Sequence, residues 1–137
     1  MKFLPALILS ASLAASLVAC ARDEQQQVRH VIDAVEAAAE KRDTSDIMEF
    51  VAADYSDSDG LDRAQLENYL RAYLMAHPKV ELITSIDKLE FPADGLAQAE
   101  VTVTGVAISD IDRVRLKVEF RRSAGGDWLV SRADRQR

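Results

Sequence analysis

The chain has 137 residues and a formal net charge of −6, and 48% of its residues are hydrophobic, so one domain plus a terminal segment is expected. An internal disulfide is excluded because there is one cysteine. The charge is uneven: residues 22–67 carry 13 acidic and 5 basic side chains, whereas residues 112–137 carry 4 acidic and 8 basic ones. Overall acidity argues against nucleic-acid binding, and the basic end faces either solvent or an acidic partner.

The first twenty residues have the layout of a secretory signal. Lys2 supplies a positive start, and an uncharged, mainly apolar run follows from residue 3 to residue 18, as in signal peptides. Residues 17–20 read Leu-Val-Ala-Cys, which resembles the lipobox of bacterial lipoproteins. The resemblance implies cleavage between Ala19 and Cys20 and a diacylglycerol group on the Cys20 sulfur. Two alternatives are an uncleaved anchor, which needs about 20 apolar residues, and ordinary secretion with an incidental cysteine.

This interpretation divides the chain into a lipoprotein signal peptide at residues 1–19, a lipidated cysteine with a short tether at residues 20–22, and a domain at residues 23–137. We expect lipid on Cys20 to hold the protein on the periplasmic side of a membrane in the bacterial cell envelope. Two or three acyl chains anchor firmly because each buried methylene contributes about 0.8 kcal/mol. Ala21 follows the cysteine. Since an aspartate there resembles an inner-membrane retention signal, alanine favours the outer membrane.

The domain is expected to begin with an amphipathic helix over residues 23–41. Its apolar residues recur at the spacing of one helical face, namely Val28, Val31, Ile32, Val35 and Ala39. His30 lies opposite this stripe and is expected to be solvated rather than a ligand. A short second helix is predicted to run through Ala53, with Asp43 or Thr44 as its N-cap.

Residues 54–60 form an acidic break, Asp-Tyr-Ser-Asp-Ser-Asp-Gly, which invites comparison with a calcium loop. An EF-hand loop needs oxygen ligands at positions 1, 3 and 5, a glycine at position 6 and a glutamate at position 12. With Gly60 at position 6, Tyr55 falls at position 1 and Leu66 at position 12, so both ends fail. The segment therefore predicts an ordinary turn stabilised by short polar side chains, and no metal site is expected.

The third helix has the clearest start in the chain, because Asp62 and Gln65 have the spacing of a capping box. Pro78 ends the helix. One stripe of it carries Leu66, Tyr69, Leu70, Tyr73 and His77. We interpret this stripe as the inward face, which makes Tyr69, Tyr73 and His77 the candidate ligand-binding residues. The alternative is that the tyrosines are core residues and that His77 lies at the favourable end of the helix dipole.

After Pro78, apolar residues recur at every second position, which predicts β-strands. Four strands are expected, over residues 80–91, 96–108, 113–121 and 128–133. In the first strand the alternation slips near Asp87 and Lys88, which indicates a β-bulge, and in the second the phase changes at Gly105, which indicates a bend. Along the strands, every second residue is apolar, and the residues between them are polar and mainly basic. This alternation predicts an antiparallel meander with one face covered and the other exposed to solvent.

Three helices followed by four antiparallel strands predict an α+β domain, in which the helices pack on a bent four-stranded sheet. The arrangement resembles the NTF2-like family, also described as cystatin-like α+β cones. The resemblance rests on the helix at residues 28–41, the break at 54–60, the helix at 62–76 and the Gly-Asp-Trp-Leu-Val stretch at 126–130. It extends over nearly all of the domain, and the whole chain is similar to short proteobacterial lipoproteins of this family.

The resemblance implies a pocket within the cone, but the family includes isomerases, dehydratases, cyclases, ligand pockets and interaction domains, so fold does not assign function. A catalytic carboxylate would have to face the pocket, whereas Glu100 and Glu119 take the outward parity. The sequence contains no zinc cluster, phosphate loop or nucleophile elbow, so no catalytic residue and no cofactor is assigned. The leading hypothesis is a non-catalytic envelope lipoprotein that binds a small apolar ligand or an envelope protein. The alternative is a lipid-anchored enzyme of the isomerase or hydratase kind.

Overall fold

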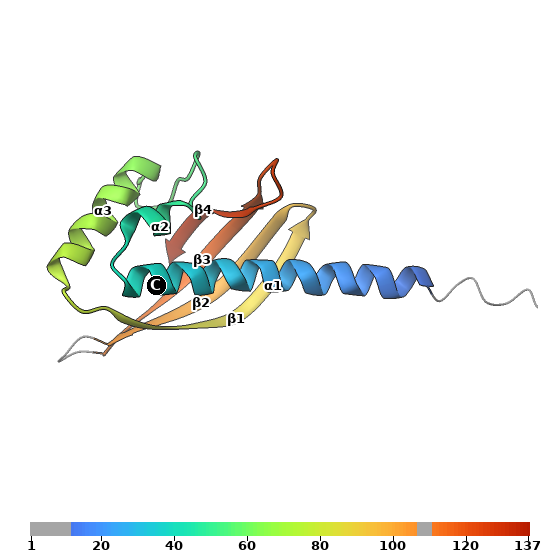
Figure 1. The fold of residues 1–137 in the computed structure, drawn as a ribbon, viewed down its shortest axis with the longest axis horizontal. Coiled ribbons are helices and arrows are strands. Elements are labelled where there is room, and N and C mark those ends of the chain that lie inside the picture. Colours follow the sequence, from blue (N-terminus) through green and yellow to red (C-terminus); the bar gives the residue numbers. More distant parts are fainter. Residues whose placement is uncertain (1–11, 107–110) are drawn as a thin grey trace, which may run out of the picture.

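The computed structural model describes the backbone of residues 12–106 and 111–137, and the side chains of residues 22–105 and 112–137. The elements follow in the order α1 (Ser12–Glu40), α2 (Thr44–Met48), α3 (Arg63–Ala76), β1 (Glu81–Ala93), β2 (Leu96–Val106), β3 (Ile111–Arg122) and β4 (Trp128–Arg135). Three helices thus precede a four-stranded sheet, and α1 crosses the concave face of that sheet (Figure 1). The predicted α+β class is confirmed.

The sheet is a simple antiparallel meander with the strand order β1-β2-β3-β4, and it does not close into a barrel. The register between β1 and β2 shifts between Ile86 and Lys88, where the alternation of the sequence slips, so the predicted bulge is confirmed. Two further shifts lie between Glu90 and Ala93 of β1 and, where β3 pairs with β4, between Glu119 and Phe120. Bulges bend and twist a sheet. The predicted end of the second strand at residue 108 lies outside the described residues.

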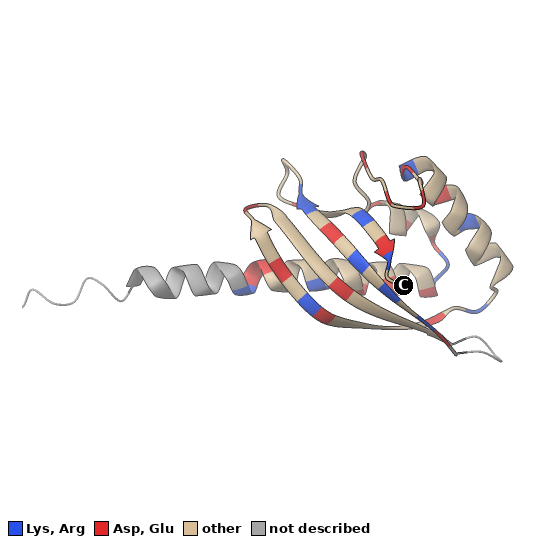
Figure 2. Cartoon of the chain, turned by 180° about the vertical axis from the view of Figure 1, so that it is seen from behind, with Lys and Arg blue, Asp and Glu red and all other residues tan. Residues whose placement is uncertain are grey.

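The core lies between α1 and the concave face of β2 and β3. Val28 of α1 and Phe120 of β3 are 0% and 1% exposed, and both belong to one cluster of buried side chains. The inward parity of the strands is buried as expected, with Ala97, Ala99, Val101, Val118 and Phe120 all below 9% exposure. No polar or charged residue is buried in the described part of the chain. Seen from the side away from α1, the strands carry interspersed acidic and basic residues (Figure 2).

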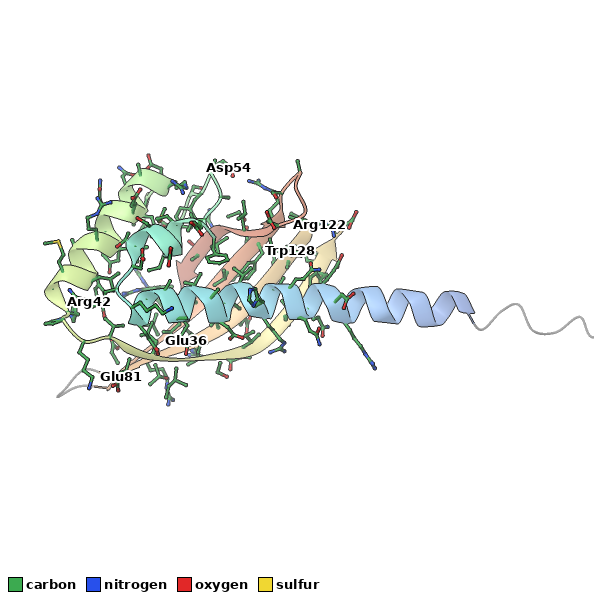
Figure 3. All side chains as sticks on the ribbon, viewed as in Figure 1. Glu36, Arg42, Asp54, Glu81, Arg122 and Trp128 are labelled. Carbon is green, nitrogen blue, oxygen red and sulfur yellow. The ribbon has the colours of Figure 1, made fainter. Side chains whose placement is uncertain are left out.

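Trp128, at the start of β4, fastens the two layers at the end of the domain where α1 enters. Its indole Nε1 donates a 3.0 Å hydrogen bond to Gln27 of α1, and its ring meets Phe91 edge-on at 5.8 Å between centroids. The Arg122 guanidinium lies 5.6 Å from the Trp128 ring and pairs with Glu24 at 2.9 Å and with Asp94 (Figure 3). These contacts tie α1 to the β1–β2 and β3–β4 turns.

Two helices differ from the prediction in their bounds. Helix α1 begins at Ser12 rather than at residue 23, so it runs through the residues assigned to the tether. Helix α2 begins as expected, because the Asp43 side chain accepts a hydrogen bond from the Asp46 amide at 3.0 Å. It ends at Met48 instead of Ala53, because the next residues pair with β4. Over residues 12–106 and 111–137, no helix combines the length and apolarity needed to cross a membrane.

The outer edge of β4 is covered by the segment that follows α2. Val51 forms a parallel bridge with Val130, and the Ala52 and Ser56 amides donate to the Val130 and Ser131 carbonyls at 2.9 and 3.3 Å. An exposed strand edge would offer unpaired backbone groups to other chains. This pairing satisfies those groups, and it is the tertiary contact that stops α2 early.

Candidate functional site

The main concave feature of the described residues is a cavity of about 1670 Å³ between α1, the inner face of the sheet and α3. Its apolar wall consists of Val31, Ile32, Val35, Ala39, Leu66, Leu70, Val101, Val103, Val114, Leu116, Val118, Phe120, Val130 and Ala133. An apolar lining with a few polar groups is typical of small-molecule sites, although those usually measure about 300–1000 Å³. The larger volume here reflects a cone that is open at one end.

The cone is open because α3 does not lie across the sheet. Leu74 is the one residue of α3 that is buried, and the helix stands beyond the end of α1 (Figure 1). Two arginines hold it there. Arg42 donates from Nε and Nη2 to the Leu74 carbonyl at 3.2 and 2.9 Å, and Arg63 Nη2 donates to the Met48 carbonyl at 2.9 Å. The helix is thus fixed to the α1–α2 turn and to α2 rather than to the strands.

The start of α3 confirms the predicted capping box. The Asp62 carboxylate accepts from the Gln65 amide at 2.8 Å, and the Gln65 side chain accepts from the Asp62 amide at 2.9 Å. The acidic segment before it is a turn, as predicted, with the Asp57 carboxylate accepting from the Asp59 and Leu61 amides at 3.0 Å each. Gly60 has a φ of +81°, a conformation that residues with a side chain rarely adopt.

The turn also contributes a polar pair to the cavity wall, Tyr55 and Asp57. Tyr55 is 3% exposed, and its hydroxyl donates a 2.8 Å hydrogen bond to Asp57 Oδ2. Burial, together with the hydrogen bond and negative charge of Asp57, raises the pKa of Tyr55 above its usual range. The phenol therefore stays protonated and acts as a donor. The sequence places Tyr55 in a turn and does not reveal this role, because the residues that pack around it include Leu66 and Leu70 of α3 and Val130 and Ala133 of β4, which lie elsewhere in the chain.

A further polar group at the cavity is Glu36, on the side where α1 meets β1 (Figure 3). The Thr84 hydroxyl donates to Glu36 Oε2, and the Glu40 carboxylate one turn later accepts from the Leu82 amide at 3.3 Å. Glu100 is exposed and Glu119 lies opposite Arg132 on the outward parity, as expected for both. The carboxylates that line the cavity come from α1 (Glu36), from the turn after α2 (Asp57 and Asp59) and from the start of β3 (Asp112). Asp112 precedes the predicted start of the third strand at residue 113, and the other three lie outside the strands, so strand parity did not reveal them.

The structure corrects the predicted inward stripe of α3. Leu66 and Leu70 are half-buried as expected, but Tyr69 and Tyr73 are 49% and 45% exposed. Tyr73 stacks between Tyr69 and His77, at ring-centroid distances of 6.4 and 4.1 Å. Only Tyr69 of the three also lines the cavity. The stripe turns outward because the arginine contacts orient α3 so that Leu74 is buried instead.

The proposed ligand-binding role of Tyr69, Tyr73 and His77 stays a prediction. His77 is the C-cap of α3, and its ring Nδ1 lies 2.7 Å from the Tyr73 carbonyl, as suits a residue at a helix end. His30 is exposed, as expected, and borders a separate hollow of about 830 Å³ beside Trp128. Cys20 and Ala19 belong to the backbone of α1, and their side chains lie outside the described ones, so lipidation and cleavage also stay predictions.

These contacts give two carboxylates at the cavity a structural role. Asp57 accepts hydrogen bonds from one hydroxyl and two amides of its own turn. Glu36 accepts from the Thr84 hydroxyl and so joins α1 to β1. In the described residues, no group of three or more metal-ligating side chains converges. The rest of the cavity lining is mainly apolar, with charged side chains from Asp59, Asp112, Arg113, Arg115, Arg135 and Arg137.

Searches for similar proteins find neither a matching family model nor a matching curated protein. Solved structures match well. A protein of unknown function with a cystatin-like fold from Nostoc punctiforme superposes with a TM-score of 0.67 at 17% identity, over 81% of this chain and 88% of that one. An NTF2-like protein of unknown function from Pseudomonas putida gives 0.66 at 19% identity, over 84% and 87%. Aln2 from a Streptomyces species gives 0.68 at 14% identity, over 84% and 90%.

Proposed function

From an NTF2-like, cystatin-like fold with an open apolar cone, we propose that this chain is a lipid-anchored protein of the bacterial cell envelope that binds a small apolar ligand. The observation that carries the proposal is the apolar wall of the cavity, where α1, β2 and β3 present Val, Ile, Leu and Phe side chains that α3 leaves uncovered. Burial of apolar area drives association in such a site. The proposal is binding rather than catalysis, because most of the cavity wall is apolar and Asp57 and Glu36 already accept hydrogen bonds from the protein.

The direction of the opening supports a ligand that comes from the periplasm. The cavity is bordered by Glu36 and Ala39, near the end of α1, whereas the anchor is placed at Cys20, near its start. Since an α-helix rises 1.5 Å per residue, about 30 Å of α1 separate Cys20 from Glu40. We infer that the anchor sits at one end of the domain and that the mouth of the cone faces away from the membrane.

The anchor is tested by replacing Cys20 with serine. In cells fed with labelled palmitate, we expect label in the wild-type chain and none in Cys20→Ser, because the serine hydroxyl does not replace the cysteine sulfur in lipobox processing. The wild-type chain should sediment with membranes and Cys20→Ser should not, since the acyl chains supply the anchoring free energy. Equal labelling of the two chains would refute the anchor.

The cavity is tested by photolabelling the full chain in phosphatidylcholine nanodiscs with a neutral long-chain alkyl diazirine. We expect cross-links on the cavity wall, mapped by mass spectrometry to the peptides that contain Val103 and Leu116. Val103→Trp fills part of the cavity and should lower this labelling several-fold, because the tryptophan displaces the probe.

The matched control is Ile83→Trp, at an apolar position of β1 that is 63% exposed and opposite Thr104. It adds the same side chain to the sheet without entering the cavity, so labelling of the wall should stay at the wild-type level. Cross-links spread evenly over both faces of the sheet, or the same loss in both variants, would exclude the cone as the binding site. Circular dichroism of both variants confirms that the fold is kept.

A further inference from the structure

Arg135 lies on the concave side of the sheet, where the inward positions are mainly apolar, with Thr84 of β1 and Asp112 of β3 as polar exceptions. Arg135 of β4 is the register partner of Leu116 of β3, and directly opposed residues of an antiparallel pair project from the same face. Leu116 packs against the core and lines the cavity, and Arg135 lines it as well. The Arg135 guanidinium therefore reaches the mouth of the cone from its inner face.

The strand pairing that aims Arg135 continues past the end of β4. The Gln136 amide donates to the Arg115 carbonyl at 2.9 Å, so the chain stays extended for at least one more residue. Because side chains alternate along an extended chain, Arg137 follows Arg135 on the concave side, and it too lines the cavity. Two positive charges thus stand at one rim of a mainly apolar cavity, whose lining elsewhere carries Arg113, Arg115 and the carboxylates of Glu36, Asp57, Asp59 and Asp112.

Three other arginines of β3 and β4 have carboxylate partners. Arg121 pairs with Asp54, Arg122 with Glu24 and Asp94, and Arg132 with Asp134. Within the described side chains, no carboxylate lies within 4.0 Å of the Arg135 guanidinium. Two acidic groups near Arg135 are held by other donors: Asp134 by Arg132 and the Ser58 amide, and Asp57 by the turn. Asp112 lies farther along the concave face, four residues from Leu116, the register partner of Arg135. Arg135 is left to bind an anion from outside.

We propose that the ligand of the cone is a single-chain anionic amphiphile of the fatty-acid class, with its acyl chain on the apolar wall and its carboxylate on Arg135. This inference rests on the proposed function and adds the charge of the ligand. A guanidinium matches a carboxylate because two parallel N–H donors meet its two oxygens. Each methylene of the chain adds apolar area buried against residues such as Val103 and Leu116. Arg137 adds to the positive potential at the rim.

The test compares three twelve-carbon competitors that differ in their head groups: dodecanoate, dodecanol and dodecyltrimethylammonium. Each competitor is added to the full chain in nanodiscs together with the neutral alkyl diazirine, and the loss of photolabelling in the cavity is measured. The concentration that halves the labelling is expressed as the free aqueous concentration of the competitor. We expect dodecanoate to compete at least about tenfold better than dodecanol, which corresponds to about 1.4 kcal/mol. The cationic amphiphile should compete least, because it approaches two like charges.

Arg135→Gln should weaken dodecanoate about tenfold and leave dodecanol unchanged, since only the charged head group uses the guanidinium. The matched control is Lys117→Gln, which removes one positive charge from the convex face of the neighbouring strand, opposite Asp134. It should leave all three competitors at their wild-type midpoints.

The outcomes separate this inference from the function on which it rests. If dodecanol competes as well as dodecanoate and Arg135→Gln changes the midpoint of neither, the cone binds apolar ligands, and the inference that the ligand has an anionic head group is wrong. If none of the three competes and the diazirine does not label the wall, the proposed function fails. An equal effect of Arg135→Gln and Lys117→Gln would mean that overall charge acts, not a site at Arg135, and would overturn the assignment.

Discussion

Val118→Asp is expected to unfold the domain. Val118 is 7% exposed in the centre of β3 and belongs to the core cluster that joins the sheet to α1. An aspartate there would bury a carboxylate with no cationic partner, which costs several kcal/mol. Because small domains are stable by only about 5–15 kcal/mol, we expect a loss of the cooperative thermal transition, or a fall in melting temperature of well over 10 °C, by circular dichroism.

Arg115→Asp is the control on the same strand. Arg115 is exposed on the convex face, so the substitution changes surface charge without burying it, and surface changes are usually worth less than about 0.5 kcal/mol. The two variants place the same new side chain three residues apart, on opposite faces of β3. Equal damage in thermal melts would contradict the assignment of faces on which the cavity also depends.

Trp128→Ala is expected to destabilise the domain by about 3–5 kcal/mol, as is usual when a buried aromatic side chain is truncated to alanine. Trp128 is 3% exposed and packs edge-on against Phe91, under the guanidinium of Arg122. Its removal leaves a cavity where β4 meets the start of the packed part of α1. Urea unfolding followed by circular dichroism measures the loss.

Two variants divide this effect into its parts. Trp128→Phe keeps an aromatic ring and loses the indole N–H, so it should cost clearly less than Trp128→Ala. Gln27→Leu removes only the acceptor of the 3.0 Å bond and leaves the indole N–H unpaired, which should cost about 1–3 kcal/mol. If Trp128→Ala is no worse than Gln27→Leu, the ring contributes little packing, and the proposed fastening of α1 to the strand turns is wrong.

Local patterns were sufficient for the parts of the fold that depend on nearby residues. The Asp62 and Gln65 capping box forms because both partners lie within one helical turn. The bulge near Asp87 appears in the structure where the alternation slips, because a strand can bury one parity only if an extra residue absorbs the change. The inward residues of β2 and β3 are buried for the same reason. The α+β class followed from the order of the patterns, because apolar residues recur at helical spacing up to residue 77 and at every second position after Pro78.

The orientation of α3 could not be inferred from its own sequence. Tyr69 and Tyr73 lie at the spacing of an inward stripe, yet Leu74 is the residue that α3 buries. The deciding contacts come from Arg42 and Arg63, which donate hydrogen bonds to backbone carbonyls far away in the sequence. The spacing of apolar residues along α3 carries no information about such contacts. Because α3 is held at the side, the cone stays open, and whether it was open or filled depended on this one placement.

The sequence by itself determined the helix caps, the strand parities, the bulge and the candidate lipid-attachment site at Cys20, because each is a pattern among neighbouring residues. Only the tertiary structure decided that α2 ends at Met48, that Tyr55 is buried against Asp57, and that Arg135 faces the concave side. All three follow from β4, whose edge takes up the segment after α2 and whose register with β3 aims the arginine. The segment after α2 pairs with residues of β4 that are more than seventy positions away in the sequence. The face on which Arg135 lies depends on how β4 is aligned with β3, which the alternation of side chains along β4 does not specify. Both contacts therefore form only when the whole sheet is assembled.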